Sequence, residues 1–136
     1  SPNELLSLAS RQNFLRRLAD ELSLANRGNV PLACVLLSLE GFRFYVDTYG
    51  YDTLNQLFEH LMRVIKRQVR QADLVARLED DELAVLLPRS NDQAAETLLR
   101  RIEEGLAQAP FYLDGEPEPL RIHAGIVALP LPYEQT

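Results

Sequence analysis

The sequence is poor in cysteine, in basic residues and in long apolar runs, and each shortage excludes a class of protein. The single cysteine, Cys34, cannot form an internal disulfide and is consistent with a reducing compartment. Only 14 Lys and Arg stand against 20 Asp and Glu, and a net charge of −6 argues against sequence-independent nucleic-acid binding. The apolar runs are too short to span a bilayer, and the first residues do not resemble a signal peptide. We therefore expect a cytoplasmic domain with no nucleic-acid partner and no membrane insertion.

What the sequence does contain is enough apolar material for one folded domain. Its 136 residues are 46% hydrophobic, which suits a single hydrophobic core. Apolar spacing and turn residues predict the following elements. They are a helix over 11–26, a strand over 32–39, a long helix over 54–70, paired strands over 74–78 and 83–87, a helix after a capping box of Ser90 and Gln93, a small strand over 111–113, a loop over 114–119 and a last strand over 120–129.

The order of these elements predicts the fold class. From residue 32 onward it reads strand, helix, strand, strand, helix, strand, which is the split β-α-β arrangement of ferredoxin-like folds. We expect an α+β domain with an antiparallel-containing sheet, helices on one face of that sheet, and one extra helix at the N-terminus. This architecture hosts many unrelated functions, so the fold alone does not identify an activity.

Several motifs, in a fixed order along the chain, are more specific. The segment 35–52 contains Phe42, Arg43 and the run Asp47-Thr-Tyr-Gly50, and the segment 70–83 ends in Glu79-Asp-Asp-Glu-Leu83. Further matches lie near the two ends, at Leu5, Leu8, Arg11, Phe14 and Ile122–Val127. Together these motifs resemble the GGDEF domain of diguanylate cyclases, and Glu79 to Leu83 stands where the signature Gly-Gly-Asp-Glu-Phe would be. The resemblance covers nearly the whole chain and implies the cyclase-palm form of the ferredoxin-like fold.

The resemblance also implies a domain organisation and a reaction. GGDEF domains condense two GTP molecules into cyclic di-GMP, a bacterial second messenger, with one GTP held by each of two facing domains. The family usually continues into one more helix carrying a Lys and a short strand, whereas this sequence stops at Thr136. We therefore expect a single degenerate GGDEF domain over residues 1–136, truncated at its C-terminus, that forms part of a larger signalling protein beside EAL or sensor domains.

The positions that would bind metal and guanine have changed. The family's metal carboxylate corresponds to Ser38, a neutral hydroxyl, and divalent cations of this kind prefer carboxylate oxygens. Glu40 keeps the second acid of the family's Asp-x-Asp pattern and points to the same face. The guanine-reading Asn and Asp correspond to Val46 and Asn55, and a valine cannot hydrogen-bond a base.

The signature hairpin has changed as well. Two glycines would let the backbone take positive φ close to the nucleotide, but Glu79 and Asp80 add side chains and negative charge there. Asp81 and Glu82 remain as remnants of the acidic pair, and the four acids are expected to form a solvated hairpin tip. The sequence therefore predicts no catalytic residues, no resident metal and no cofactor, with magnesium expected only if residual GTP binding exists.

One family site is retained. Arg70 and Asp73 form an Arg-x-x-Asp motif five residues before the signature position, where the resemblance implies an inhibitory site for cyclic di-GMP. A guanidinium can grip guanine O6 and N7, while a carboxylate accepts from N1–H and N2–H. For this use both side chains should be exposed on one edge. The alternative is local chemistry: an Arg in the last turn of a helix and an Asp in a turn before a strand.

Three functions remain open at this stage. The first is an inactive GGDEF domain that acts as a regulatory or receptor module and binds cyclic di-GMP at Arg70 and Asp73. The second is a structural or homodimerisation module without a ligand. The third is a live cyclase in which Glu40, Asp81 and Glu82 carry the metals. Of the two histidines, His60 is expected at the surface and His123 without a metal-binding role.

Overall fold

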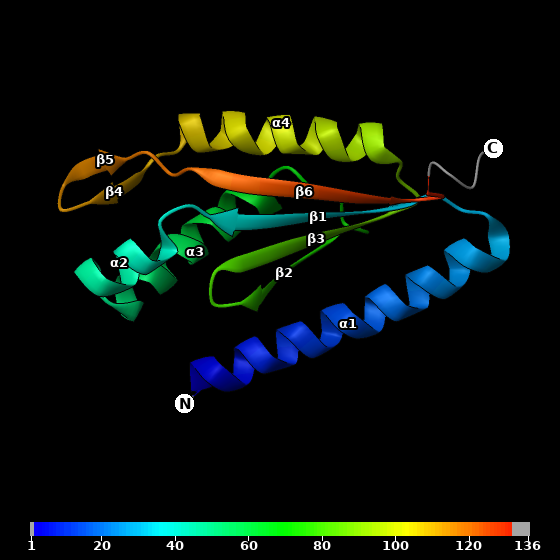
Figure 1. Ribbon diagram of the computed structural model, residues 1–136, viewed down its shortest axis with the longest axis horizontal. Coiled ribbons are helices and arrows are strands. Elements are labelled where there is room, and N and C mark those ends of the chain that lie inside the picture. The colour runs from blue at the N-terminus through cyan, green and yellow to red at the C-terminus, as the bar shows by residue number, and fades with distance from the viewer. Residues whose placement is uncertain (1, 132–136) are drawn as a thin grey trace.

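The computed structural model describes the backbone of residues 2–131 and the side chains of residues 8–131. Four helices, four strands of one sheet and a small two-stranded hairpin follow one another along this part of the chain (Figure 1). The elements are α1 (Pro2–Gly28), β1 (Leu32–Leu39), α2 (Phe42–Tyr49), α3 (Tyr51–Lys66), β2 (Leu74–Glu79), β3 (Glu82–Pro88), α4 (Asp92–Gln108), β4 (Phe111–Leu113), β5 (Glu116–Glu118) and β6 (Ile122–Leu129).

The main sheet has the strand order β2-β3-β1-β6, and every neighbouring pair is antiparallel. β1 is central because it pairs with β3 on one side and with β6 on the other. The two crossovers, through α3 and through α4, each skip one strand, which is the split β-α-β pattern. The predicted α+β, ferredoxin-like fold is therefore confirmed.

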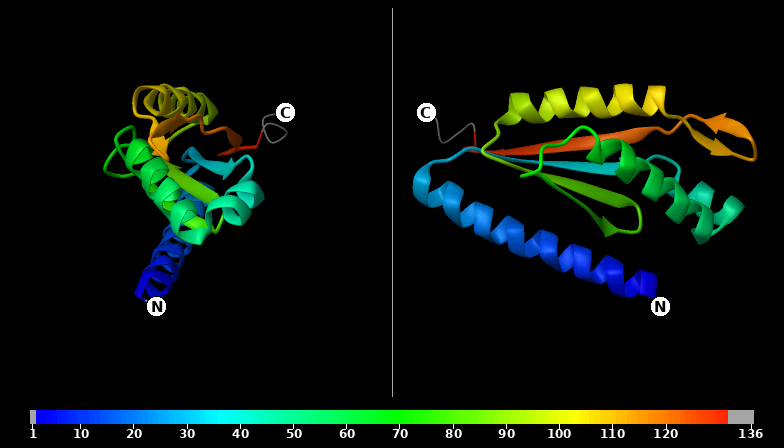
Figure 2. Two further views of the ribbon diagram at one scale, coloured as in Figure 1. Left: turned by 90° about the vertical axis from the view of Figure 1, so that its left-hand side faces the viewer. Right: turned by 180° about the vertical axis from the view of Figure 1, so that it is seen from behind.

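The two faces of the sheet are covered by different helices: α3 and α4 of the split β-α-β core lie on one face, as expected, and the extra N-terminal helix α1 lies on the other. Side chains alternate along each strand, so Val35 and Leu37 join the core beneath α3 and α4, whereas Leu36 points to the opposite face. On that second face Phe14 of α1 is 1% exposed and packs with the sheet. Figures 1 and 2 show α1 along one side of the sheet and α4 along the other.

The helix α2 was not predicted, and the helix after it is shorter than expected, ending at Lys66 rather than near residue 70. Gly41 (φ 81°) precedes α2, and Gly50 (φ 88°) separates α2 from α3. Both glycines adopt the positive φ that other residues resist, so each can reverse the chain abruptly. Tyr45 is buried, and Phe42, Val46 and Tyr49 pack partly buried against the same core, so the segment has the i, i+3, i+4, i+7 apolar spacing of a short amphipathic helix, a signal that the prediction missed.

Three local predictions also need correction. The N-cap of α4 is Asn91, whose side chain accepts from the Ala94 N–H, and Ser90 is buried instead. The expected loop over 114–119 contains β5, because positive φ at Asp114 and Gly115 closes a tight β4–β5 hairpin. His60 is partly buried rather than a free surface residue, with Nε2 2.6 Å from the Ala109 carbonyl oxygen. Within the described residues, no helix combines the length and apolarity needed to cross a membrane.

Candidate functional site

Ser38, Glu82 and His123 lie in one row across three neighbouring strands. Ser38 of β1 is opposite Glu82 of β3 on one side and opposite His123 of β6 on the other. Residues opposite each other in antiparallel strands project to the same face, so the three side chains are neighbours. Two residues beyond Ser38, Glu40 Oε1 lies 3.6 Å from His123 Nε2, and both side chains are largely exposed.

This donor set does not fit the divalent cation that the family's reaction requires. Position 38 offers a neutral hydroxyl where a carboxylate is needed, and Glu40 is turned to an exposed imidazole. Over residues 8–131, whose side chains the structure describes, no group of three or more His, Cys, Asp or Glu side chains is arranged to hold a metal ion. The row is therefore a polar strand end in which position 38 contributes no charged ligand.

The β2–β3 hairpin turns without any residue in the left-handed region. Glu79 pairs with Glu82, the register shifts between Arg77 and Glu79, and no residue from 79 to 82 has a positive φ. The glycines of the family motif are thus not needed by the backbone seen here. Asp80 is exposed, as expected for a solvated tip.

Glu79 is not a free acid of that tip. Arg11 of α1 reaches the hairpin, with Nη1 2.8 Å from Glu79 Oε1 and 2.9 Å from the carbonyl oxygen of Leu78. The ion pair is half exposed, so its contribution to stability is small. The ion pair nevertheless links α1 to the β2–β3 hairpin. No pattern in the sequence indicates this contact, since the two residues are 68 positions apart.

The two positions that correspond to the guanine-reading residues lie on α2 and α3. Val46 is partly buried and packs against the main core. Asn55 Oδ1 accepts a hydrogen bond of 2.7 Å from Arg77 Nη1. The Arg77 guanidinium also lies 4.3 Å from the centre of the Phe58 ring and donates through Nε to the Asp80 carbonyl oxygen over 3.2 Å.

Arg77 is therefore a central member of the site that sequence reasoning did not identify. Burial lowers the pKa of this guanidinium, and the nearby carboxylates, Asp80 first, act in the opposite direction. An arginine remains protonated under any ordinary condition, so Arg77 acts as a fixed donor. The only indication in the sequence was that Arg77 is a basic residue among the mostly apolar residues of strand β2.

Arg70 and Asp73 form an ion pair with each other. Arg70 Nη2 lies 2.7 Å from Asp73 Oδ1, and Asp73 Oδ2 accepts from the backbone N–H of Arg70 over 2.8 Å. The same Nη2 donates to the Pro88 carbonyl oxygen over 2.8 Å and to Ser90 Oγ over 2.9 Å. Hydrogen bonding to Asp73 raises the pKa of Arg70.

The exposure of the two motif residues differs sharply. The Arg70 side chain is 56% exposed, whereas that of Asp73 is 3% exposed, so the expectation that both face solvent is wrong for Asp73. Because α3 ends at Lys66, Arg70 also lies beyond the last helical turn, in the connection to β2. The alternative of local chemistry therefore holds for Asp73, whose carboxylate accepts a hydrogen bond from a backbone N–H of its own turn. It does not hold for Arg70, because that residue lies beyond the end of α3.

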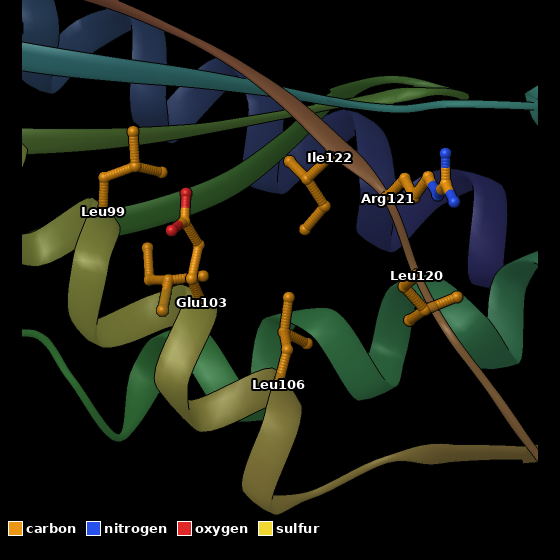
Figure 3. A pocket seen from close by; sticks show the side chains of 7 residues that line it. Leu99, Glu103, Leu106, Leu120, Arg121 and Ile122 are labelled. Atoms are coloured by element: carbon orange, nitrogen blue, oxygen red, sulfur yellow. The ribbon is translucent and has the colours of Figure 1, made fainter.

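A separate pocket of about 290 Å³ lies between α4 and the start of β6. Figure 3 shows its lining side chains, which are mostly apolar, with Glu103 and Arg121 as the charged members. None of the positions predicted as site residues lines it. The pocket and the polar row at Ser38 are therefore distinct features.

Comparison with known proteins agrees with the motifs. Residues 4–136 match the sequence family described as "Diguanylate cyclase, GGDEF domain". Diguanylate cyclase DgcP of Pseudomonas aeruginosa is 30% identical over 124 residues, which are 91% of this chain and 18% of DgcP. Cyclic di-GMP phosphodiesterase NbdA of the same species is 28% identical over 133 residues, 98% of this chain and 17% of NbdA.

The fold also matches solved structures. The GGDEF domain of TpbB (YfiN) from Pseudomonas aeruginosa superposes with a TM-score of 0.78 at 32% identity, over 88% of this chain and 70% of that one. The chain thus spans most of an isolated GGDEF domain, but less than a fifth of DgcP or NbdA.

Proposed function

This chain belongs to the GGDEF family of diguanylate cyclases, and from that premise we propose that it is a catalytically inactive member that acts as a regulatory module in cyclic di-GMP signalling. The observation that carries the proposal is Ser38. The position from which the family would supply a metal carboxylate holds a hydroxyl, in register between Glu82 and His123.

The missing carboxylate matters because triphosphate chemistry needs a cation to neutralise the developing charge. A serine hydroxyl contributes no charge to hold that cation. Glu40 does not replace it, since its carboxylate lies beside His123 at the exposed end of the row. Asp81 and Glu82 alone would leave any cation mainly to solvent.

The hairpin adds a second defect. A triphosphate at the tip would meet the carboxylates of Glu79 and Asp80, and like charges in a partly water-excluded cleft repel. Arg11 neutralises only one of them, since its salt bridge is to Glu79. The proposal therefore rests on independent lesions in the metal position, the base position and the hairpin.

A regulatory role follows from what the domain keeps. It retains a packed α+β core and a hairpin joined to α1, and in its relatives the matching segment is a small part of a longer protein. We propose that it forms one part of a larger multidomain protein, next to an EAL phosphodiesterase or a sensor domain, and that it acts on that neighbour by contact, as a monomer or as a homodimer. NbdA, a cyclic di-GMP phosphodiesterase with a matching segment, supports this arrangement by similarity.

A direct assay tests the loss of activity. The purified domain is incubated with GTP and magnesium or manganese, and cyclic di-GMP is measured by chromatography beside an active GGDEF domain as positive control. We expect no product above the buffer background. Product that disappears when Asp81 or Glu82 is replaced by alanine would refute the proposal and favour the live cyclase.

The second candidate function is a cyclic di-GMP receptor at Arg70. What favours it is the 56% exposure of a guanidinium that Asp73, Pro88 and Ser90 already hold in one orientation. A preorganised donor loses less entropy when it binds a guanine. Calorimetric titration with cyclic di-GMP tests the candidate, with Arg70→Ala as the variant and the exposed Arg67→Ala as matched control. If the wild type gave no binding heat and a second method also showed no binding, cyclic di-GMP would not be a ligand and a structural module without a ligand would be favoured.

A further inference from the structure

We infer that Arg11 is a positioning residue: from α1 it holds an irregularity in the β2–β3 hairpin, and that irregularity in turn aims Arg77 at α3 on the opposite face of the sheet. This link goes beyond the proposed function, because it involves no nucleotide and no metal and would operate in an active or an inactive domain. It gives the domain a route by which a change at its first helix reaches the far side of the sheet.

The hairpin contains a bulge close to its tip. The register shifts between Arg77 and Glu79, so Leu78 has no partner of its own in the ladder. A bulged residue leaves backbone groups outside the ladder and changes the aim of the side chains beside it. Arg11 binds one of these groups, because its Nη1 donates to the carbonyl oxygen of Leu78 over 2.9 Å in a partly buried contact.

Consecutive residues at the end of β2 point to opposite faces of the sheet. Leu78 packs with the cluster around Phe14, on the face that α1 covers. Arg77 points the other way, where its guanidinium lies 4.3 Å from the centre of the Phe58 ring and donates over 2.7 Å to Asn55 Oδ1. A slip of one residue would exchange the two faces, so the register at the bulge also decides which face Arg77 reaches.

Three residues on one side of α1 attach this helix to β2. They are Arg11, Phe14 and Arg17, at successive spacings of three residues. Phe14 is buried against the sheet, and Arg17 Nη2 donates over 3.2 Å to the carbonyl oxygen of Ala72, just before the strand. A displacement of α1 is therefore felt at both ends of β2, and at the hairpin end it acts through Arg11.

On the α3 side, the guanidinium of Arg77 holds the turn itself. Its Nε and Nη2 both donate to the carbonyl oxygen of Asp80. The tip is thus held between the two helices, by Arg11 at Leu78 and by Arg77 at Asp80. The Arg11–Glu79 ion pair is half exposed and such pairs contribute little, so the contact with the Leu78 carbonyl is the one that supports the bulge.

Nuclear magnetic resonance of the isotope-labelled domain tests the link through two side-chain signals, the Nε–H of Arg77 and the Nδ2 amide of Asn55. Arg11→Gln should shift both signals and speed the exchange of the Arg77 Nε–H with solvent by about twofold or more. Arg16→Gln is the matched control, because it removes the same charge from an exposed position of α1 and should leave both signals in place. Glu79→Gln removes the ion pair but keeps the carbonyl contact, so its effect should be much smaller than that of Arg11→Gln.

The same link can be tested from the other side of the sheet, because coupling between two positions is reciprocal. Asn55→Ala removes the partner of Arg77 on α3. It should shift the backbone amide signals of Leu78 and Glu79, which lie where Arg11 binds the hairpin. An Asn55→Ala effect that stops at Arg77 would overturn the inference.

The remaining outcomes are equally decisive. Side-chain signals that stay in place in Arg11→Gln would overturn the inference, as would signals that move equally far in Arg16→Gln or in Glu79→Gln. Circular dichroism of each variant confirms that it is folded. Formation of cyclic di-GMP is assayed separately, so turnover would refute the proposed function without changing the expected shifts.

Discussion

Arg70 and Asp73 form an ion pair in which one partner is open to solvent and the other is not, with Nη2 and Oδ1 2.7 Å apart and exposed fractions of 56% and 3%. The pair joins the connection after α3 to the end of β3, because the same guanidinium reaches the Pro88 carbonyl oxygen and Ser90 Oγ. Whatever ligand the motif binds, it is first a structural link between two segments of the fold.

Replacing Arg70 by alanine should therefore destabilise the domain. The substitution leaves the Asp73 carboxylate buried with only the backbone N–H of residue 70 as a partner, and we expect a loss of about 1–3 kcal/mol in the free energy of unfolding. Urea denaturation measures it. Arg67→Ala, at an exposed position on the same connection, should change stability by less than about 0.5 kcal/mol. Equal stability of the wild type and Arg70→Ala would mean that the pair is only a surface contact.

Gly105 lets α4 pack closely on α3, because it has no Cβ. A Cβ added there would lie 2.9 Å from Val64 Cγ1, on the buried side of α3. Alanine gains about 1 kcal/mol of helix propensity, but overpacking costs about 1–3 kcal/mol, so Gly105→Ala should be net destabilising. The double variant Gly105→Ala/Val64→Ala should show non-additive free energies, since the second change removes the clash. Gly125→Ala, where a Cβ meets nothing within 4 Å, is the control.

The buried hydroxyl of Tyr45 predicts a loss of stability at alkaline pH. Burial, followed by the 2.8 Å hydrogen bond to Glu118, raises the pKa of Tyr45 from 10.0 to about 12. The unfolded chain then releases its proton at lower pH than the folded one. The contribution of this group is complete below pH 10 and is lost as pH rises through about 12.

Thermal unfolding from pH 8 to the alkaline limit tests this dependence on the wild type and on Tyr45→Phe. The variant should be less stable at neutral pH by about 1 kcal/mol, because the hydrogen bond is lost, and its stability should fall less steeply in the alkaline range. Tyr112→Phe, at an exposed tyrosine, should leave both quantities unchanged. Parallel pH profiles for wild type and Tyr45→Phe would contradict the assignment.

Much of the fold could be predicted from the sequence because its signals are local. The apolar run over 32–39 and the stripe from Leu54 to Val69 identify a buried strand and an amphipathic helix directly. The helix α2 was missed although Phe42, Tyr45, Val46 and Tyr49 have helical spacing, because its eight residues supply only two turns of that pattern. The N-cap of α4 was misplaced because Ser90 and Asn91 are both good caps, and the choice between them depends on Arg70, twenty residues away.

The site was predictable as a set of positions but not as a set of contacts. The motif order singled out Ser38, Val46 and Asn55 as candidate positions, and the register of β1 places Ser38 opposite Glu82, a pairing that was not predicted. The links from Arg77 to Asn55 and from Arg11 to Glu79 depend on which elements pack together, 22 and 68 residues apart. The partners of each pair lie on different elements, α3 with β2 and α1 with β2, so no periodicity within one element could reveal these pairs.

Restoring a carboxylate at position 38 gives the sharpest test of whether the lesions are independent. We expect that Ser38→Asp will not produce cyclic di-GMP from GTP, since Val46, Asn55 and the Glu79-Asp80 pair remain in place. Groups that act as a unit are strongly non-additive, so repairing one should have little effect on turnover. Clear turnover by this single variant would mean that only the metal position had been lost.

The same variant carries a stability readout that does not depend on activity. Position 38 lies directly opposite Glu82, so an aspartate there places two carboxylates side by side, while His123 across the other strand gives little relief when neutral. Like charges opposite each other in a sheet are destabilising by about 0.2–1 kcal/mol. We expect Ser38→Asp to be less stable than Ser38→Asn in urea denaturation at pH 7. Magnesium should not reverse the difference, because two carboxylates without a base pocket or an open hairpin hold the cation weakly. If magnesium instead stabilised Ser38→Asp but not Ser38→Asn, the metal position would be repairable by one residue, and inactivity would have to come from the base pocket and the hairpin alone.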